Sequence, residues 1–330
     1  SELSKGKLDI VIGTHSLLSK QIEFYKLGLV IVDEQHKFGI RQRSALSEQL
    51  ESPNKMQPHQ IFISATPIPR SLSLVLYEGL DYTLIKDLPQ GRKTIITKLI
   101  HNADKKTLYT SVRNILNKGF QAYWVCPSIN QTESSELEYI YDVYEKLQIE
   151  LKEYSMGMLH GQADKTDNEK AMNNFIMGKH KILVCTTMIE VGVDIENATC
   201  IVVEDSNRFG LSQLHQLRGR VGRSNKQSFC YLVYKDNISD DGRVRLESLE
   251  KNSDGFLIAE EDLKLRGSGD YLGVRQSGYN NNFKLATIDD LITNIEIVKG
   301  LKNNIINLRD NNKAKLLSRW GNVESETLRL

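Results

Sequence analysis

Three short apolar runs between residues 181 and 234 decide the fold: KILVCTT (181–187), CIVVED (200–205) and SFCYLVY (228–234). Their apolar residues follow one another without the alternation of a half-exposed strand. Such runs are typical of strands that are covered on both faces, as in a parallel sheet between layers of helices. We therefore predict an α/β architecture.

The same pattern continues outward from this stretch. Similar runs occur at LDIVIG (8–13), LGLVIVD (27–33), QIFISAT (60–66) and QAYWVCP (121–127). Amphipathic segments at 105–116, 133–153 and 164–176 predict intervening helices, and Asp164 is placed to cap the last of them. From about residue 237 the strand pattern stops, which predicts a helical extension with a Gly-rich loop at 266–273.

The domain boundaries follow from these runs and from a turn-forming stretch, LPQGR (88–92), that interrupts them. We predict three parts: 1–92, too short for a complete α/β domain; 93–236, a complete α/β domain; and 237–330, the helical extension. The first residue is Ser1, and an apolar run follows within a few residues. The chain is therefore expected to be a fragment of something longer.

Composition excludes several classes of protein. The 330 residues include 43 Lys and Arg against 42 Asp and Glu, so any phosphate-binding site must come from local clustering rather than from the overall charge of +1. Four widely separated cysteines predict buried thiols in a reducing compartment. The absence of a long apolar run or a signal pattern predicts a cytoplasmic protein without a membrane partner. No HExxH or CxxC spacing occurs, so no zinc site is proposed.

Two adjacent acids, Asp33 and Glu34, follow the apolar run LVIV (29–32). In nucleotide hydrolases, such a strand end needs one acid to hold Mg²⁺ and another to take a proton from the attacking water. A plain polar strand end is the alternative. A second run ends in Ser64-Ala65-Thr66, whose hydroxyls suit a hydrogen-bond relay beside those acids, although they are also ordinary helix caps.

The strongest local feature is QLHQLRGRVGR (213–223). The segment from residue 206 to 235 has no acid but six basic residues: Arg208, Arg218, Arg220, Arg223, Lys226 and Lys235. Arginines separated by glycines suit close approach to phosphate oxygens during phosphoryl transfer. A solvated basic turn is the alternative.

Hydroxyl and turn residues after other runs suit contacts with a nucleic-acid backbone. These are Thr14 and His15, HGQ (160–162), Thr186 and Thr187, with Gly192 and Asp194 beyond them. Asp194 could bind a ribose hydroxyl or an arginine. Each of these segments, taken alone, is also compatible with a capped loop.

Taken in order, these segments resemble superfamily 2 helicases. The set is GTH (13–15), VDEQH (32–36), SATPIPR (64–70), HGQ (160–162), TTMIEVGVDI (186–195) and QLRGRVGR (216–223). More narrowly, DEQHKFGIRQR (33–43), LPQGR (88–92) and IAEEDLKLRGSGDYLGVRQSG (258–278) resemble the RecG family, bacterial ATP-dependent DNA helicases that remodel stalled forks and recombination intermediates.

The resemblance implies RecA-like lobes, ATP and Mg²⁺ as cofactors, and branched DNA such as forks and Holliday junctions as partner. It implies that Asp33 and Glu34 serve Mg²⁺ and the water, and that Gln35 and His36 couple them to Ser64, Ala65 and Thr66. It implies arginine fingers at Arg220 and Arg223 with Gln216 nearby, and nucleotide contacts by Gly192 and Asp194. It implies DNA contacts by Thr14, His15, Thr186 and Thr187, and translocation by Arg266 and Gln276.

One family feature is missing from the chain. No G-x-x-x-x-G-K-[ST] segment occurs, since Gly6-Lys7 and Gly178-Lys179 are followed by Leu and His. The chain alone is therefore expected to have little ATPase activity, and a separately encoded N-terminal half is a candidate partner. Three alternatives remain open: a non-catalytic DNA-binding remnant, a fragment of a transcription-repair coupling translocase, and a nucleotide-binding transferase without nucleic acid.

Overall fold

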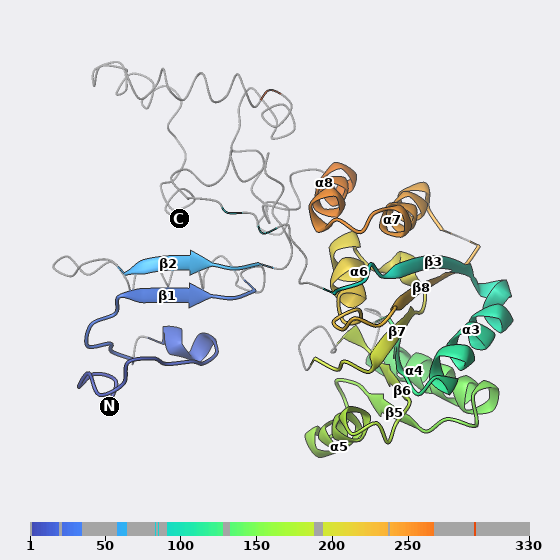
Figure 1. Cartoon of the computed structure of the whole chain (residues 1–330), viewed down its shortest axis with the longest axis horizontal. Coiled ribbons are helices and arrows are strands. Elements are labelled where there is room, and N and C mark those ends of the chain that lie inside the picture. The colour runs from blue at the N-terminus through green and yellow to red at the C-terminus, as the bar shows by residue number, and fades with distance from the viewer. Residues whose placement is uncertain are drawn as a thin grey trace. The chain divides into compact units, whose positions relative to one another are not determined.

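The computed structural model describes residues 2–19, 22–34, 58–64, 83, 85, 91–127, 133–187, 194–236, 238–266 and 294. The chain divides into two compact units, one made of residues 1–80 and 272–330 and the other of residues 81–271. Each unit is considered by itself below (Figure 1).

The first unit contains a two-stranded parallel sheet. Strand β1 (Leu29–Val32) pairs with β2 (His59–Phe62), with Val32 opposite Phe62. Val32 is buried against Leu27, Val30 and Phe62. A short 3-10 helix, η1 (His15–Leu18), precedes them.

The predicted strand at 8–13 is wrong. Residues 8–13 form no strand, and the side chains of Ile10 and Ile12 are 80% and 94% exposed. A strand needs a neighbour to pair its backbone groups, and in the described part of the unit β1 pairs only with β2. An apolar run alone does not supply that neighbour.

The second unit is a six-stranded parallel sheet in the order β3-β8-β7-β4-β6-β5. The strands are β3 (Ile96–His101), β4 (Gln121–Val125), β5 (Met156–Leu159), β6 (Ile182–Cys185), β7 (Ala198–Val203) and β8 (Phe229–Tyr234). All residues of β4, β6 and β7 are buried. These runs are apolar on both sides because both sides of the sheet are covered.

Helices cover the two faces of this sheet. They are α3 (Lys105–Asn117), α4 (Glu133–Glu150), α5 (Lys165–Ile176), α6 (Leu211–Arg218), α7 (Asp240–Lys251) and α8 (Gly255–Arg266), with 3-10 turns η3 (Asn102–Asp104) and η5 (Ser206–Arg208). Ala122 and Trp124 of β4 pack with α3 and α4, whereas Tyr123 and Val125 pack with α5 to α8. Successive strand residues point to opposite faces, so β4 serves both cores.

The predicted helices at 105–116, 133–153 and 164–176 are confirmed by α3, α4 and α5. Asp164 occupies the N-cap position of α5, but its side chain makes no capping hydrogen bond. Its backbone carbonyl instead accepts hydrogen bonds from the amides of Asp167 and Asn168. Within the predicted extension the structure describes residues 238–266 and 294, and these form the helices α7 and α8 without a strand.

Candidate functional site

The strand ends of the first unit bring two predicted segments together. The backbone amide of Ile63 donates to the carbonyl of Val32 at 2.8 Å, which continues the β1–β2 ladder past both strands. Because the strands are parallel, Asp33 after β1 and Ser64 after β2 lie at the same edge of the sheet. Four of the predicted partners, Gln35, His36, Ala65 and Thr66, lie outside the described residues.

The turn after β1 presents its first acid to solvent. Asp33 is exposed, and its Oδ1 accepts a hydrogen bond from the Glu34 amide at 2.8 Å. Glu34 has a positive φ of 52°, a conformation that costs a non-glycine residue roughly 1–2 kcal/mol. An exposed carboxylate on a sharply turned strand end can bind a hydrated cation.

Thr14 and His15 also belong to the first unit. Thr14 is exposed, and its hydroxyl lies 3.1 Å from that of Ser16. His15 begins η1. The structure therefore leaves the Thr14 hydroxyl at the surface, within the same turn as the start of the 3-10 helix.

In the second unit, the predicted arginine fingers lie on a tight turn after α6. Gly222 in this turn has φ +74°, and a Cβ there would lie 2.7 Å from Cγ1 of Ile95. Only glycine fits such a position. The Arg92 side chain donates through Nε to the Gly222 carbonyl at 2.8 Å, so the LPQGR stretch fastens the turn that carries Arg220 and Arg223.

Asp194 lies beside the same turn. Its Oδ1 is 3.8 Å from Nε of Arg223, which also donates to the Gly219 carbonyl at 3.2 Å. Burial raises the pKa of Tyr123, and the charges of Arg220 and Arg223 oppose that rise, so both guanidinium groups act on this hydroxyl. Gln216 is half-buried on α6, and Gly192 lies outside the described residues.

Arg218 is the exception among the three arginines that were expected to suit phosphate. It is buried, and its guanidinium donates to the carbonyls of Leu249 and Asn252 at 2.8 Å. These carbonyls lie at the end of α7, where a helix leaves acceptors unpaired. The expectation of phosphate contact is wrong for Arg218, which holds α7 against α6.

His215 lies next to Arg218. Its Nδ1 is 3.0 Å from the Arg218 guanidinium. Burial, and then the Arg218 charge, lowers the pKa of His215 to about 4. The imidazole is therefore neutral at physiological pH.

The predicted residues of the second unit separate to opposite ends of the sheet. Arg220 and Arg223 precede β8 and Asp194 precedes β7, so all three lie at the amino ends of the strands. Thr186 and Thr187 follow β6 and lie at the carboxyl ends. Thr186 is buried, whereas Thr187 is half-buried.

His160 of the HGQ segment also lies at the carboxyl ends, after β5. Asn168 fastens its backbone by two hydrogen bonds: its Oδ1 accepts from the His160 amide at 3.2 Å, and its Nδ2 donates to the His160 carbonyl at 2.9 Å. Arg266 ends α8, and Gln276 lies outside the described residues.

Sequence reasoning missed a polar site at the carboxyl end of β7. The buried Glu204 accepts from the Trp124 indole at 3.0 Å and pairs with Lys105 at 2.9 Å. The next residue, Asp205, has φ 43° and pairs with Lys235 at 2.8 Å. The sequence contains a signal for it, because CIVVED (200–205) repeats the pattern of an apolar run followed by two acids in LVIVDE (29–34).

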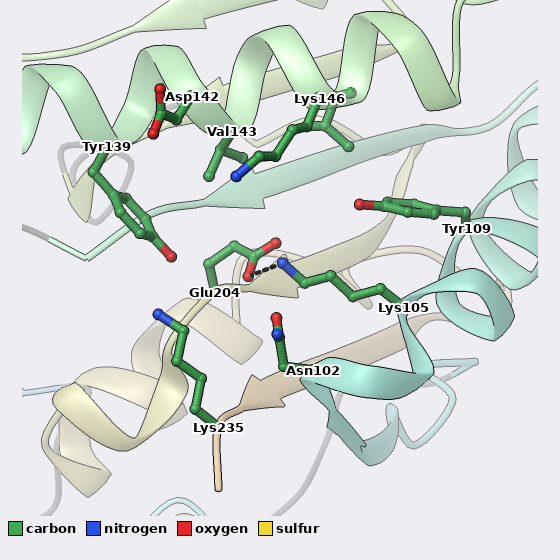
Figure 2. A pocket seen from close by; sticks show the side chains of 10 residues that line it. Asn102, Lys105, Tyr109, Tyr139, Asp142, Val143, Lys146, Glu204 and Lys235 are labelled. Carbon is green, nitrogen blue, oxygen red and sulfur yellow. Dashed lines mark ion pairs between the residues drawn. The ribbon is translucent and has the colours of Figure 1, made fainter. Parts of the chain in front are cut away.

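A pocket opens at this site between α3 and α4 (Figure 2). Figure 2 shows lysines from α3, α4 and the end of β8 converging around Glu204. The lining residues are Asn102, Lys105, Tyr109, Tyr139, Asp142, Val143, Lys146, Leu147, Glu204 and Lys235. We refer to it below as the β7 pocket.

Models of three helicase segments match the chain in order. The DEAD/DEAH box helicase matches residues 1–75, the helicase conserved C-terminal domain matches residues 106–225, and the C-terminal part of domain 3 of the ATP-dependent DNA helicase RecG matches residues 252–317. The chain belongs to the RecG family.

RecG of Escherichia coli K12 is 39% identical over 319 residues, which cover 96% of this chain and 46% of that protein. RecG of Aquifex aeolicus is 45% identical over 280 residues, 84% of this chain and 35% of that protein. The chain thus spans less than half the length of these RecG proteins.

A solved structure of RecG bound to a three-way DNA junction is 37% identical. It matches with a TM-score of 0.66 over 90% of this chain and 37% of that one. The fold is therefore the RecA-like helicase fold of RecG, with parallel sheets between helices, as the sequence predicts.

Two kinds of feature are absent from the part of the chain that the structure describes. None of their helices is long and apolar enough to cross a bilayer. Nor do the described His, Cys, Asp and Glu side chains gather into a group that could hold a metal ion.

Proposed function

We propose that the chain is the C-terminal part of a RecG-type ATP-dependent helicase that translocates on branched DNA in repair and recombination. The observation that carries this proposal is the turn that contains Arg220 and Arg223, which we call the arginine turn. Arg92 donates a hydrogen bond to the Gly222 carbonyl of this turn, and Asp194 lies beside Arg223. The bound three-way junction in the related RecG structure supports forks and Holliday junctions as partners. In this proposal the three predicted parts, 1–92, 93–236 and 237–330, are a partial first lobe, a second lobe and a translocation extension.

The residues of the first unit suit ATP and Mg²⁺. Asp33 would hold the ion through its water shell, and Glu34 would take a proton from the attacking water. Gln35 and His36 would couple ATP hydrolysis at this site to the segment that contains Ser64, Ala65 and Thr66. The exposure of Asp33 and its position at the same sheet edge as Ser64 support this assignment. Bound Mg²⁺ supplies charge neutralisation for the phosphates.

The residues of the second unit also suit a role in ATP hydrolysis. Arg220 and Arg223 would stabilise the negative charge that develops on the transferred phosphoryl group, a role that Gly222 supports by holding both on one turn. Gly192 and Asp194 would contact the nucleotide, with Gln216 nearby. Asp194 and the Gly219 carbonyl restrain the guanidinium of Arg223 before any ligand arrives.

Contacts with DNA would come from other parts of the chain. Thr14 and His15 in the first unit and Thr186 and Thr187 in the second would bind backbone phosphates. Arg266 and Gln276 would turn lobe movement into translocation. Exposure of Thr14 and partial exposure of Thr187 support these roles.

A polypeptide of these 330 residues should not hydrolyse ATP, because it contains no G-x-x-x-x-G-K-[ST] segment to cradle the phosphates. An N-terminal half encoded separately would supply that segment. The apolar face formed by Leu29, Ile31, Ile61 and Ile63, which are 47–58% exposed, supports such a partner. Alternate residues of a strand share a face, so the four side chains lie together.

The test is an ATPase assay of the purified chain with forked DNA, alone and after mixing with a RecG N-terminal half that carries the phosphate loop. We expect no hydrolysis alone and DNA-stimulated hydrolysis after mixing. Robust hydrolysis by the chain alone would contradict the proposal. DNA binding without restored hydrolysis would favour the second candidate, a non-catalytic DNA-binding remnant.

A further inference from the structure

The β7 pocket lies beside two neighbouring strands, β4 and β7, whose following connections cross to opposite faces of the sheet. After β4 the chain runs into α4, which packs on the same face as α3, whereas after β7 it runs into α6 on the other face. Neighbouring strands β4 and β7 therefore form a switch point. Crevices outside the carboxyl ends of strands at such points are where open α/β sheets bind ligands.

Buried acids hold two of the pocket lysines in place. Glu204 is 2% exposed, and its two oxygens accept from Trp124 and Lys105. Asp205 is 4% exposed, and its Oδ2 pairs with Lys235. An ammonium group has three N–H donors, so one carboxylate contact leaves further donors on Lys105 and Lys235.

Other donors line the same space. The Lys146 side chain extends from α4 toward Glu204, and the Tyr109 hydroxyl faces the pocket from α3 (Figure 2). Burial, and then the charge of Glu204, raises the pKa of Tyr109 to about 12. The phenol is therefore protonated at neutral pH and can donate a hydrogen bond.

The charge balance selects the ligand. The lining carries three lysines against Asp142 and Glu204, and Asp205 lies behind Lys235. The pocket thus offers directed N–H and O–H donors without a large net positive charge. A highly charged ligand such as a triphosphate would remain uncompensated, whereas a phosphodiester has one negative charge and accepts several hydrogen bonds.

We propose that the β7 pocket binds one phosphodiester of a DNA backbone through Lys105, Lys146 and Lys235. This inference rests on the proposed DNA-binding function and adds a contact to it. The pocket and Thr187 lie at the same end of the sheet. The distance across the sheet is two strand spacings from β6 to β7 and three from β6 to β8, or about 10–14 Å. At about 3.4 Å of helix axis per phosphate on one strand, the pocket holds a phosphate about three to four nucleotides from Thr187.

Lysine acetylation read by mass spectrometry tests the site directly on the whole chain. The chain is labelled alone, with a forked oligonucleotide, and with inorganic phosphate at the same phosphate concentration. We expect the oligonucleotide to protect Lys146 and Lys235 several-fold, and inorganic phosphate to protect neither. Protection by inorganic phosphate alone would overturn the DNA assignment in favour of a free-anion site.

The same experiment separates this inference from the proposed function. Protection of other lysines without Lys146 and Lys235 would overturn the pocket contact but leave DNA binding intact. No protection anywhere in the chain would overturn both.

A matched pair of variants provides the second readout. Lys146 is exposed on α4, and Lys170 is exposed on α5, which packs on the other face. We expect Lys146→Gln to reduce the salt slope of fork binding by about 0.9 and to weaken binding up to about eightfold at 0.1 M salt. Lys170→Gln should leave both unchanged. Equal behaviour of the two variants would overturn the inference.

Discussion

The two paired-acid turns of this chain have the same local design but opposite surroundings. Each follows an apolar strand, and in each the second acid has a positive φ: 52° for Glu34 and 43° for Asp205. After β1, Asp33 is exposed and its carboxylate contacts only the next backbone amide among the contacts found in the described residues. After β7, both acids are buried against lysines.

The difference teaches how one strand end can serve two purposes. A carboxylate that faces solvent remains available to a hydrated cation, which suits a catalytic role. A carboxylate that faces a built-in ammonium group is already compensated, and it positions that ammonium group for another ligand. The neighbouring lysines therefore distinguish the two turns, and the acids themselves do not.

Removing the lysine that pairs with Glu204 of the second turn should have the largest effect on stability. In Lys105→Met, Glu204 keeps its buried charge without an ionic partner, and we expect the free energy of unfolding to fall by about 3 kcal/mol. Urea denaturation of the chain measures it. The matched control is Lys251→Met, which removes an exposed pair with Glu247 and should cost less than about 0.5 kcal/mol. Equal losses would mean that burial does not separate these pairs.

A pH titration of stability isolates the contribution of His215, which is buried in the same unit as the second turn. Its pKa is about 4 in the folded chain against 6.5 unfolded, so the unfolded state binds more protons between these values. Stability should therefore be full above pH 6.5 and fall by roughly 1–3 kcal/mol as pH drops to 4. His215→Gln should remove this loss. An unchanged profile in that variant would show that His215 is not its source.

Neutralising one acid in each turn compares them directly. Asn tolerates the left-handed conformation, so Asp205→Asn removes the charge that faces Lys235 without adding backbone strain. We expect it to lower the free energy of unfolding by about 1–2 kcal/mol. Asp33→Asn removes an exposed charge and should change it by less than about 0.5 kcal/mol. Thermal melts of both variants provide the measurement, and a larger effect at Asp33 would reverse our interpretation of the two turns.

The smallest expected effect is the response of the two turns to an added divalent cation. Mn²⁺ stands in for Mg²⁺ at exposed carboxylates and broadens nearby NMR signals. Millimolar Mn²⁺ should broaden the backbone amides of Asp33 and Glu34 and leave those of Glu204 and Asp205 sharp, because lysines already compensate the second pair. Broadening at Glu204 would show that its lysine does not exclude a cation.

Sequence patterns predicted the second unit well because its strands are buried on both faces. ILVC (182–185) and CIVV (200–203) lie within strands β6 and β7. The same reasoning failed at residues 8–13, where apolar side chains stay exposed and pairing depends on a neighbour that the pattern does not reveal. An apolar run is buried only when the fold supplies another surface that packs against it.

The site residues show the same division. The turn with Arg220 and Arg223 was predictable because glycine and arginine spacing is local. The inward orientation of Arg218 was not, since it depends on carbonyls about 30 residues later, at Leu249 and Asn252. The β7 pocket was missed because Lys105, Glu204 and Lys235 meet only when three strand ends align.

The opposite placement of the arginine turn and Thr187 has a mechanical consequence. A six-residue strand such as β7 is about 20 Å long, and a sheet packed on both faces deforms little. The second unit can therefore behave as a stiff lever, with the turn that carries Arg220 and Arg223 at one end and Thr187, the proposed DNA contact, at the other. A rotation of about 10° about one end moves the other by about 3.4 Å, the rise of one base pair.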